Sequence, residues 1–263
     1  MPEFLAHASL GELFCLVFAF FAGLTVVSVT VGFAAERGVP NRRIMALPTP
    51  PGQRKREVVG NAVFVSVTTV AFAAALASGW VRFGDGLLRG VATFFALMFG
   101  FQIFYWGLHR AMHTKALLWA HRWHHTSQVT SALSAQSVSV VEACLWMLGY
   151  VGLPLALSLA FPIGFWGWAA YMAFNVYGNI VGHANVELSA KPGASRFMTL
   201  FANPWVYHAL HHARWNGHYA FQAALMDRIF KTELEDWPLL FAKVLRGEPL
   251  ESLKERGVEP QRP

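Results

Sequence analysis

The chain has 263 residues, of which 55% are hydrophobic and 14% are charged, and its formal net charge is +6. Soluble domains carry about 25% charged residues, so this composition argues against a soluble domain and predicts a membrane protein. The basic residues lie beside long apolar runs. This position indicates that they orient the chain in the membrane or contact lipid headgroups, and it argues against a role in binding nucleic acid. Cys15 and Cys144 form no C-x-x-C pair, which argues against a thiolate metal site or a redox dithiol.

Five apolar stretches are long enough to span a bilayer, which takes about 20 helical residues. They cover about 12–35, 58–80, 87–108, 140–161 and 163–183. The first lacks a preceding basic segment, so we interpret it as a membrane helix and not as a secretory signal. The last two form one uncharged run from Ala143 to Ala184, in which Pro162 and Gly164 mark the expected reversal. A four-span version, in which this run dips into the membrane without crossing it, is the alternative.

The polar segments predict a single orientation for the chain. Residues 36–57 are rich in Pro, Arg and Lys, which predicts a loop, and the positive-inside rule places this loop in the cytoplasm. Counting spans from there brings the histidine-rich segments 109–125 and 208–212 to the same side and leaves Arg82 and Arg89 on the other. The chain beyond residue 184 predicts short amphipathic helices that lie against the cytoplasmic interface.

We therefore predict an all-α fold, a transmembrane helical bundle of about four or five spans, in a single domain over residues 1–263. A cytoplasmic helical cap, made of about 109–137 and 184–245, would hold a histidine-rich dimetal site. The composition favours a bacterial inner membrane, with the endoplasmic reticulum as the alternative in a eukaryote.

Eight histidines fall into three clusters with helical spacing. The clusters are HRAMH, HRWHH and HALHH, with His109, His113, His121, His124, His125, His208, His211 and His212. Spacings of three and four residues bring imidazoles to one face of a helix. One zinc site takes about four ligands, so this number predicts two metal ions. Imidazole binds iron, zinc, copper and nickel, so the ligand type alone does not select the metal.

The three clusters, placed between and after membrane spans, resemble the fatty acid hydroxylase/sterol desaturase superfamily over roughly residues 90–235. The segment DRIFKT, residues 227–232, is similar to the D-R-[LI]-F-G-T element of this family, with Lys231 where glycine is usual. Residues 216–219, NGHY, replace the usual N-Y-G order after the third cluster. Neither departure changes a cluster histidine, so both bear on substrate fit or cap geometry more than on the metal site.

The resemblance implies an integral-membrane, non-haem di-iron oxygenase that uses O2 as co-substrate and two external electrons. Its reaction would be hydroxylation of an unactivated C–H bond of a lipid, either a fatty acyl chain or a sterol-like substrate. Desaturation on the same two iron ions is the alternative, and a histidine-lined metal transporter is a more distant one. A transporter would place its ligands at mid-membrane depth, whereas these clusters lie at span ends. The expected electron donor is a separate ferredoxin or cytochrome-type protein with its reductase.

The resemblance also implies that the eight clustered histidines are catalytic metal ligands and that His183, in NIVGHANVE, is an additional ligand. Ligand imidazoles need partners that fix their tautomers. The candidates near the clusters are Glu142, Asn179, Asn185, Glu187, Asn216, His218 and Asp227. Glu142 stands out because a carboxylate that opens an apolar span is costly unless it is paired.

Overall fold

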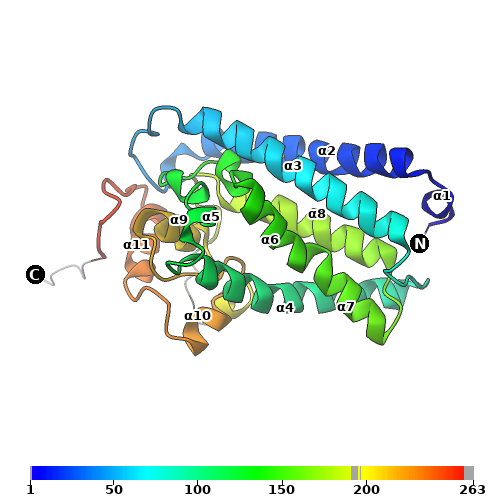
Figure 1. The fold of residues 1–263 in the computed structure, drawn as a ribbon. Helices are drawn as coiled ribbons and strands as arrows, with labels where there is room; N and C mark the ends of the chain where they lie inside the picture. The colour runs from blue at the N-terminus through cyan, green and yellow to red at the C-terminus, as the bar shows by residue number, and fades with distance from the viewer. Residues whose placement is uncertain (1, 191–194, 196, 258–263) are drawn as a thin grey trace, which may run out of the picture.

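A computed structural model describes residues 2–190, 195 and 197–257, which form a bundle of long helices with a cap of short helices at one end (Figure 1). All the regular elements among these residues are helical, which confirms the predicted all-α class. The long elements are α2 (Leu10–Gly38), α3 (Gln53–Ser78), α4 (Leu87–Met112), α6 (Val140–Tyr150), α7 (Gly152–Ala160) and α8 (Phe165–Gly182). A short α1 (Glu3–Ala6) precedes them at the end remote from the cap.

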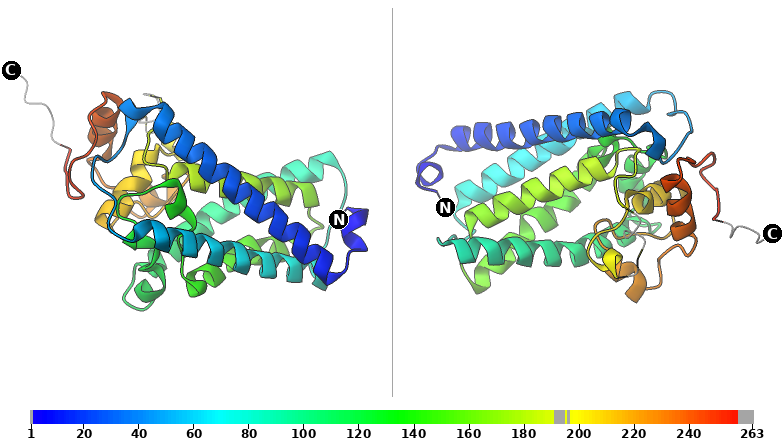
Figure 2. Two further views of the ribbon diagram at one scale, coloured as in Figure 1. Left: turned by 90° about the horizontal axis from the view of Figure 1, so that it is seen from above. Right: turned by 180° about the vertical axis from the view of Figure 1, so that it is seen from behind.

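Four helical segments within the described residues are long and apolar enough to cross a membrane. They are α2, α3, α4 and the combined α6–α7 segment, Val140–Ala160. The 18-residue α8 is not among them, because Asn175 and Asn179 lower its hydropathy. It packs between α2 and α4 inside the bundle (Figure 2). The chain therefore has the features of a membrane protein, while a fifth crossing at residues 163–183 stays a prediction.

The helices differ from the prediction in two places. The loop expected over residues 36–57 covers only 39–52, because α2 continues to Gly38 and α3 begins at Gln53. Gly52, the N-cap of α3, has a positive φ of 75°, a backbone conformation that costs glycine little free energy. This turn lets α3 begin at Gln53, two residues after Pro51.

The second difference is a break in the predicted 140–161 helix, between α6 and α7. Pro154 has no N–H to donate to the carbonyl of Tyr150, which instead accepts from Trp168 Nε1 at 3.2 Å. The break therefore follows from one proline, and the freed carbonyl is satisfied by the neighbouring helix α8.

The cap has a hydrophobic core of its own, in which Tyr207, Leu240 and Phe241 are buried. Its short elements are η1 (Pro40–Arg42), α5 (Leu118–His121), η2 (His124–Thr126), η3 (Ala132–Gln136), η5 (Met198–Leu200), α9 (Trp205–Arg214), α10 (Leu225–Ile229) and α11 (Trp237–Leu245). A two-pronged ion pair between Arg214 and Asp236, at 2.7 and 2.8 Å, fixes α9 to the start of α11. Because α9 is packed from several sides, its side chains are held rigidly against the end of the bundle.

Candidate metal centre

All nine predicted histidine ligands meet where the bundle joins the cap. They are His109 in the last turn of α4 and His113 at its C-cap, His121 on α5, His124 and His125 on η2, His183 at the C-cap of α8, and His208, His211 and His212 on α9. Every one of these side chains except His113 is buried. Segments as far apart as residues 109 and 212 thus supply a single cluster of imidazoles.

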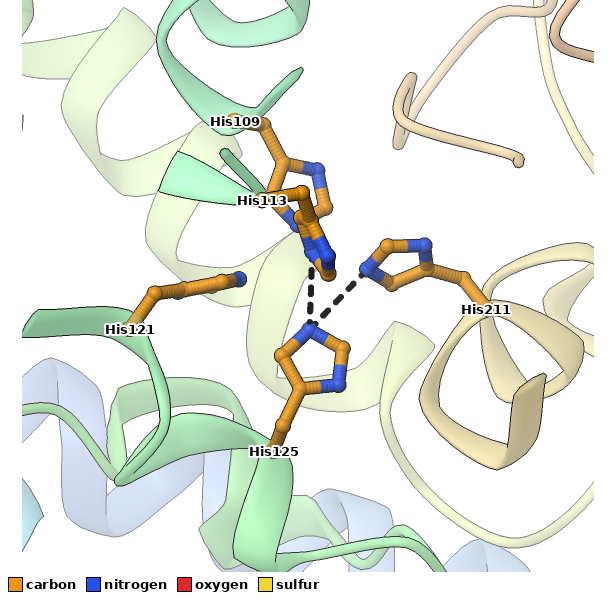
Figure 3. Close-up of side chains that lie close together, drawn as sticks. All are labelled: His109, His113, His121, His125 and His211. Carbon is orange, nitrogen blue, oxygen red and sulfur yellow. Dashed lines mark hydrogen bonds between the residues drawn. The ribbon is translucent and has the colours of Figure 1, made fainter. Parts of the chain in front are cut away.

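The nine imidazoles divide into two groups, each able to hold a metal ion, with ligand atoms within 4.8 Å of one another. The first group, which we call site A, is His109, His113, His121, His125 and His211 (Figure 3). The second group, site B, is His124, His183, His208 and His212. His124 and His125 are adjacent in sequence but belong to different groups, so η2 links the two sites.

In site A, the outer nitrogens of three rings are held by fixed acceptors. The Nδ1 atoms of His109 and His211 lie 2.7 Å from the carbonyl oxygens of Tyr219 and Gly217. His121 Nδ1 lies 2.7 Å from Glu142 Oε1. Each acceptor places the ring proton on Nδ1, so the Nε2 atom presents a lone pair, as in metal sites whose ligands are oriented by an outer acceptor.

In site B, the same arrangement recurs with backbone acceptors. His183 Nδ1 donates to the carbonyl of Asn179 at 2.7 Å, and His212 Nδ1 donates to the carbonyl of Ser127 at 3.0 Å. The Nε2 atoms of both rings lie close to that of His208, at 3.0 Å from His183 and 3.2 Å from His212. With their protons on Nδ1, the His183 and His212 Nε2 atoms are both acceptors, and a single His208 proton satisfies only one of them.

The inward-facing nitrogens fit metal ions better than they fit hydrogen bonds. His125 Nε2 lies 3.1 Å from the Nε2 atoms of both His113 and His211 (Figure 3). Nitrogens bound to one ion at about 2.1 Å stand about 3.0–3.4 Å apart. His109 Nε2 and His121 Nε2 are buried with no partner among the described residues. A cation within each group would use these lone pairs, so the donor set fits a metal at each site.

The rings outside the apolar helices are neutral, which metal binding requires. Burial, reinforced by repulsion between neighbouring imidazoles, lowers the pKa of six rings well below the usual value. They are His121, His124, His125, His208, His211 and His212. Burial also lowers the pKa of the less enclosed His113 to about 4. The imidazoles can therefore lie close together without accumulating positive charge.

Two of the seven predicted supporting residues contact the ligands directly. Glu142 accepts from His121 and also lies 3.3 Å from Trp146 Nε1. Asn179 supplies its backbone carbonyl to His183. The side chains of Glu142 and Asn179 also line a cavity of about 20 Å³ together with His121 and His124.

Three further candidates bond the backbone around the centre and do not contact the imidazoles. Asp227 is buried and accepts from the backbone N–H of Tyr219, whose carbonyl in turn holds His109. Glu187 accepts from the N–H of Val206 at 2.8 Å, at the start of α9. Asn185 instead bonds the backbone of Met45 at 2.8 and 2.9 Å, which ties the end of α8 to the loop before α3.

The remaining two candidates, Asn216 and His218, flank Gly217, whose carbonyl holds His211. Asn216 is exposed at this turn. The His218 ring stacks on Tyr207, with centroids 3.4 Å apart, and its Nδ1 donates to the Tyr207 carbonyl at 2.8 Å. His218 belongs to neither metal group, and it helps to shape the turn that presents the Gly217 carbonyl.

Sequence reasoning missed Glu57, a buried carboxylate in the second turn of α3. It accepts hydrogen bonds from the hydroxyls of Ser127, Ser131 and Ser134 at 2.9, 3.0 and 2.7 Å. Ser127 is also the residue whose carbonyl holds His212. The available signal was the same as for Glu142, a carboxylate at the start of an apolar run, but Glu57 had been assigned to the preceding loop.

The backbone acceptors at Tyr219, Gly217 and Ser127 were also missed. Any residue type offers the same carbonyl, so no signal in the sequence marks them.

Comparisons with known proteins agree with this site. The fatty acid hydroxylase family model matches residues 94–232, which are 139 of the 263 residues and include all nine histidines. The very-long-chain aldehyde decarbonylase CER1 of Arabidopsis thaliana is 31% identical over 156 residues, which are 56% of this chain and 24% of that protein. The chain thus spans about a quarter of the length of this relative. No solved structure matches the chain. The family match confirms the resemblance carried by the histidine clusters, and the chain belongs to the fatty acid hydroxylase family.

Proposed function

We propose that the chain is a membrane-bound non-haem di-iron oxygenase that hydroxylates an unactivated C–H bond of a lipid, with O2 and two electrons from a separate donor. The observation that carries this proposal is the pair of convergent imidazole groups, sites A and B, at the end of an apolar helical bundle. Family membership supports oxidative chemistry on a fatty acyl or sterol-like substrate.

Two iron ions bound at sites A and B would supply the activation of O2. The rings themselves are positioned by the acceptors on their Nδ1 atoms, so little rearrangement is needed when metal binds.

Aromatic side chains cover the bundle side of the centre. Tyr105 and Trp146 stack on each other with centroids 4.8 Å apart, and the Tyr105 ring meets His109 at 5.2 Å. Phe221 stacks on His183 at 5.3 Å. This wall would exclude water from the reacting atoms, which protects a reactive oxidant from side reactions.

The proposed location is a membrane with the metal centre on the cytoplasmic side, a bacterial inner membrane in the first instance. Arg82 and Arg89 lie at the end of the bundle remote from the cap, where they bond the carbonyls of Ser158 and Pro162 at 2.6 and 2.8 Å. The cap end of α2 and α3 carries six basic residues, as the positive-inside rule requires of a cytoplasmic side: Arg37, Arg42, Arg43, Arg54, Lys55 and Arg56. The separate electron donor, a ferredoxin or cytochrome-type protein with its reductase, would approach from that side.

Desaturation on the same site is the second candidate, since both reactions begin with hydrogen abstraction. The aldehyde decarbonylase among the relatives favours a third outcome, in which a long-chain aldehyde is converted. The products distinguish the three reactions, because hydroxylation adds one oxygen, desaturation removes two hydrogens, and decarbonylation shortens the chain by one carbon.

The test is lipid mass spectrometry of cells that express the wild type, His124→Ala or His7→Ala. His7 is an exposed histidine near the N-terminus and serves as the matched control. We expect a lipid with one added oxygen in the wild type and His7→Ala, and its loss in His124→Ala. A His124→Ala variant that keeps full product and full metal content would refute the assignment of site B.

A further inference from the structure

A cavity of about 700 Å³ lies between α4 and α8 and reaches the metal centre at His208. Its volume falls in the range of about 300–1,000 Å³ that is common for small-molecule sites. At the end of the bundle remote from the cap, α4 and α8 touch, since a Cβ on Gly167 would lie 2.1 Å from the Gly90 carbonyl oxygen. The cavity that reaches the histidines lies between the same two helices nearer the cap.

The rim of this cavity faces the surface that the membrane would cover. Phe99 and Ile103 on α4, and Phe174 and Tyr177 on α8, line the cavity and are exposed. Phe221 lines its inner end, with its ring 4.7 Å from that of His208. A lipid chain could therefore pass from the bilayer, between α4 and α8, to the rings of site B.

The lining is uncharged: among the described residues, no Asp, Glu, Lys or Arg contributes to it. An ionised carboxylate or phosphate held by this lining, away from the metal centre, would lose its hydration without gaining a cation as a partner, which is strongly unfavourable. A polar group that binds within this lining must therefore be neutral.

Two amides in the lining are suited to a neutral polar group. Gln102 Nε2 donates to Gln222 Oε1 at 2.8 Å, which joins α4 to the loop before α10. Each amide offers two donors and two acceptor lone pairs, so their mutual bond leaves further donors and acceptors for a ligand. A glutamine on a membrane-crossing helix is costly unless it is used, which makes Gln102 a candidate for function.

The amide pair is fixed to a loop of the cap that also lines the cavity. The N–H of Asn203 donates to the Gln222 carbonyl at 2.7 Å, and its Nδ2 donates to the Phe221 carbonyl at 3.2 Å. Gln102 precedes His109 by seven residues, which is about 10 Å along α4. A group bound by the two amides would thus be set back from His109 by about two turns of α4.

We infer that Gln102 and Gln222 select the substrate, and that it is a lipid with an uncharged oxygen function, such as an alcohol, aldehyde, ester or amide, several bonds away from the carbon that reacts. Their amide N–H groups would donate to this oxygen, and an Oε1 atom would accept from a hydroxyl. This inference rests on the proposed function and adds to it the chemical class of the substrate.

The test is equilibrium binding of tritiated hexadecanol to the detergent-purified protein, with no electron donor present so that nothing turns over. Unlabelled hexadecanol, hexadecane and hexadecanoate compete for the cavity at about pH 9, where the acid is ionised. The variants are Gln102→Leu and Gln222→Leu, and Met98→Leu, a volume-conserving change in the same lining, is the control.

We expect hexadecanol to compete about tenfold better than hexadecane or hexadecanoate in the wild type and in Met98→Leu. In each glutamine variant this preference for hexadecanol over hexadecane should fall to about threefold or less. Equal competition by hexadecanoate, or a full hexadecanol preference in both glutamine variants, would overturn the inference. Metal content and lipid products report separately on the proposed function, so hydroxylation without this selectivity would refute the inference alone.

Discussion

Asp227 offers the sharpest test of how the cap supports the metal centre. Its buried carboxylate accepts five hydrogen bonds through Oδ1 and Oδ2. The donors are Trp106 Nε1, Tyr207 Oη, Thr232 Oγ1 and the backbone N–H groups of Tyr219 and Ala220, at 3.0, 2.9, 2.6, 3.0 and 2.9 Å. Asp227→Ala removes every acceptor at once. It should therefore loosen the Tyr219 loop that orients His109.

The magnitude follows from these bonds. Each buried donor left without an acceptor costs about 1–3 kcal/mol, and water or local shifts recover part of the total. We expect Asp227→Ala to lower the free energy of unfolding by about 3–5 kcal/mol, the upper range for single substitutions. Asp227→Asn keeps one oxygen, and the Tyr207 hydroxyl can rotate to accept from the new amide, so its loss should be about 1–3 kcal/mol.

The assay is the thermal unfolding midpoint in detergent, followed by intrinsic tryptophan fluorescence. We expect the midpoints to rank wild type above Asp227→Asn, and Asp227→Asn above Asp227→Ala. Asp85→Ala, at an exposed aspartate in the loop between α3 and α4, is the control and should match the wild type. An Asp227→Ala protein as stable as the control would refute the reasoning.

Three further predictions follow. Glu142→Gln replaces the carboxyl group that accepts from His121 by an amide and should weaken metal binding about 10–100-fold in a chelator titration. Glu57→Ala should lower the thermal midpoint more than Glu57→Gln, because only the glutamine keeps an acceptor for the three serine hydroxyls; equal midpoints would contradict this. Burial lowers the pKa of His218 to about 3 in the folded protein. Between about pH 6.5 and pH 3 this ring therefore takes up a proton only when the chain unfolds. The free energy of unfolding of the metal-free protein should therefore decrease as the pH falls from about 6.5 towards 3. The decrease should be less steep in His218→Gln than in the wild type.

The histidine spacing predicted that eight of the nine clustered imidazoles lie together, and the family resemblance added His183. Residues three and four apart on a helix share a face, and the structure brings His208, His211 and His212 of α9 together with the clusters that follow α4. The division into sites A and B was not predictable, because the adjacent His124 and His125 point to different groups. That division depends on how η2 turns, which is set by tertiary packing.

The supporting residues show where sequence reasoning stops. Glu142 could be identified because a carboxylate in an apolar helix needs a partner, and the structure gives it His121. The same rule would have identified Glu57 if the start of α3 had been placed at Gln53. Errors in helix boundaries therefore become errors in site prediction.

The most direct test of the account is the metal content of the purified, iron-loaded protein, measured per chain by elemental mass spectrometry. We expect about two iron ions per chain in the wild type, and fewer than two in both His211→Ala, from site A, and His212→Ala, from site B. His7→Ala should retain the wild-type value. One ion or none in the wild type after iron loading would contradict the claim that the nine histidines form two metal sites.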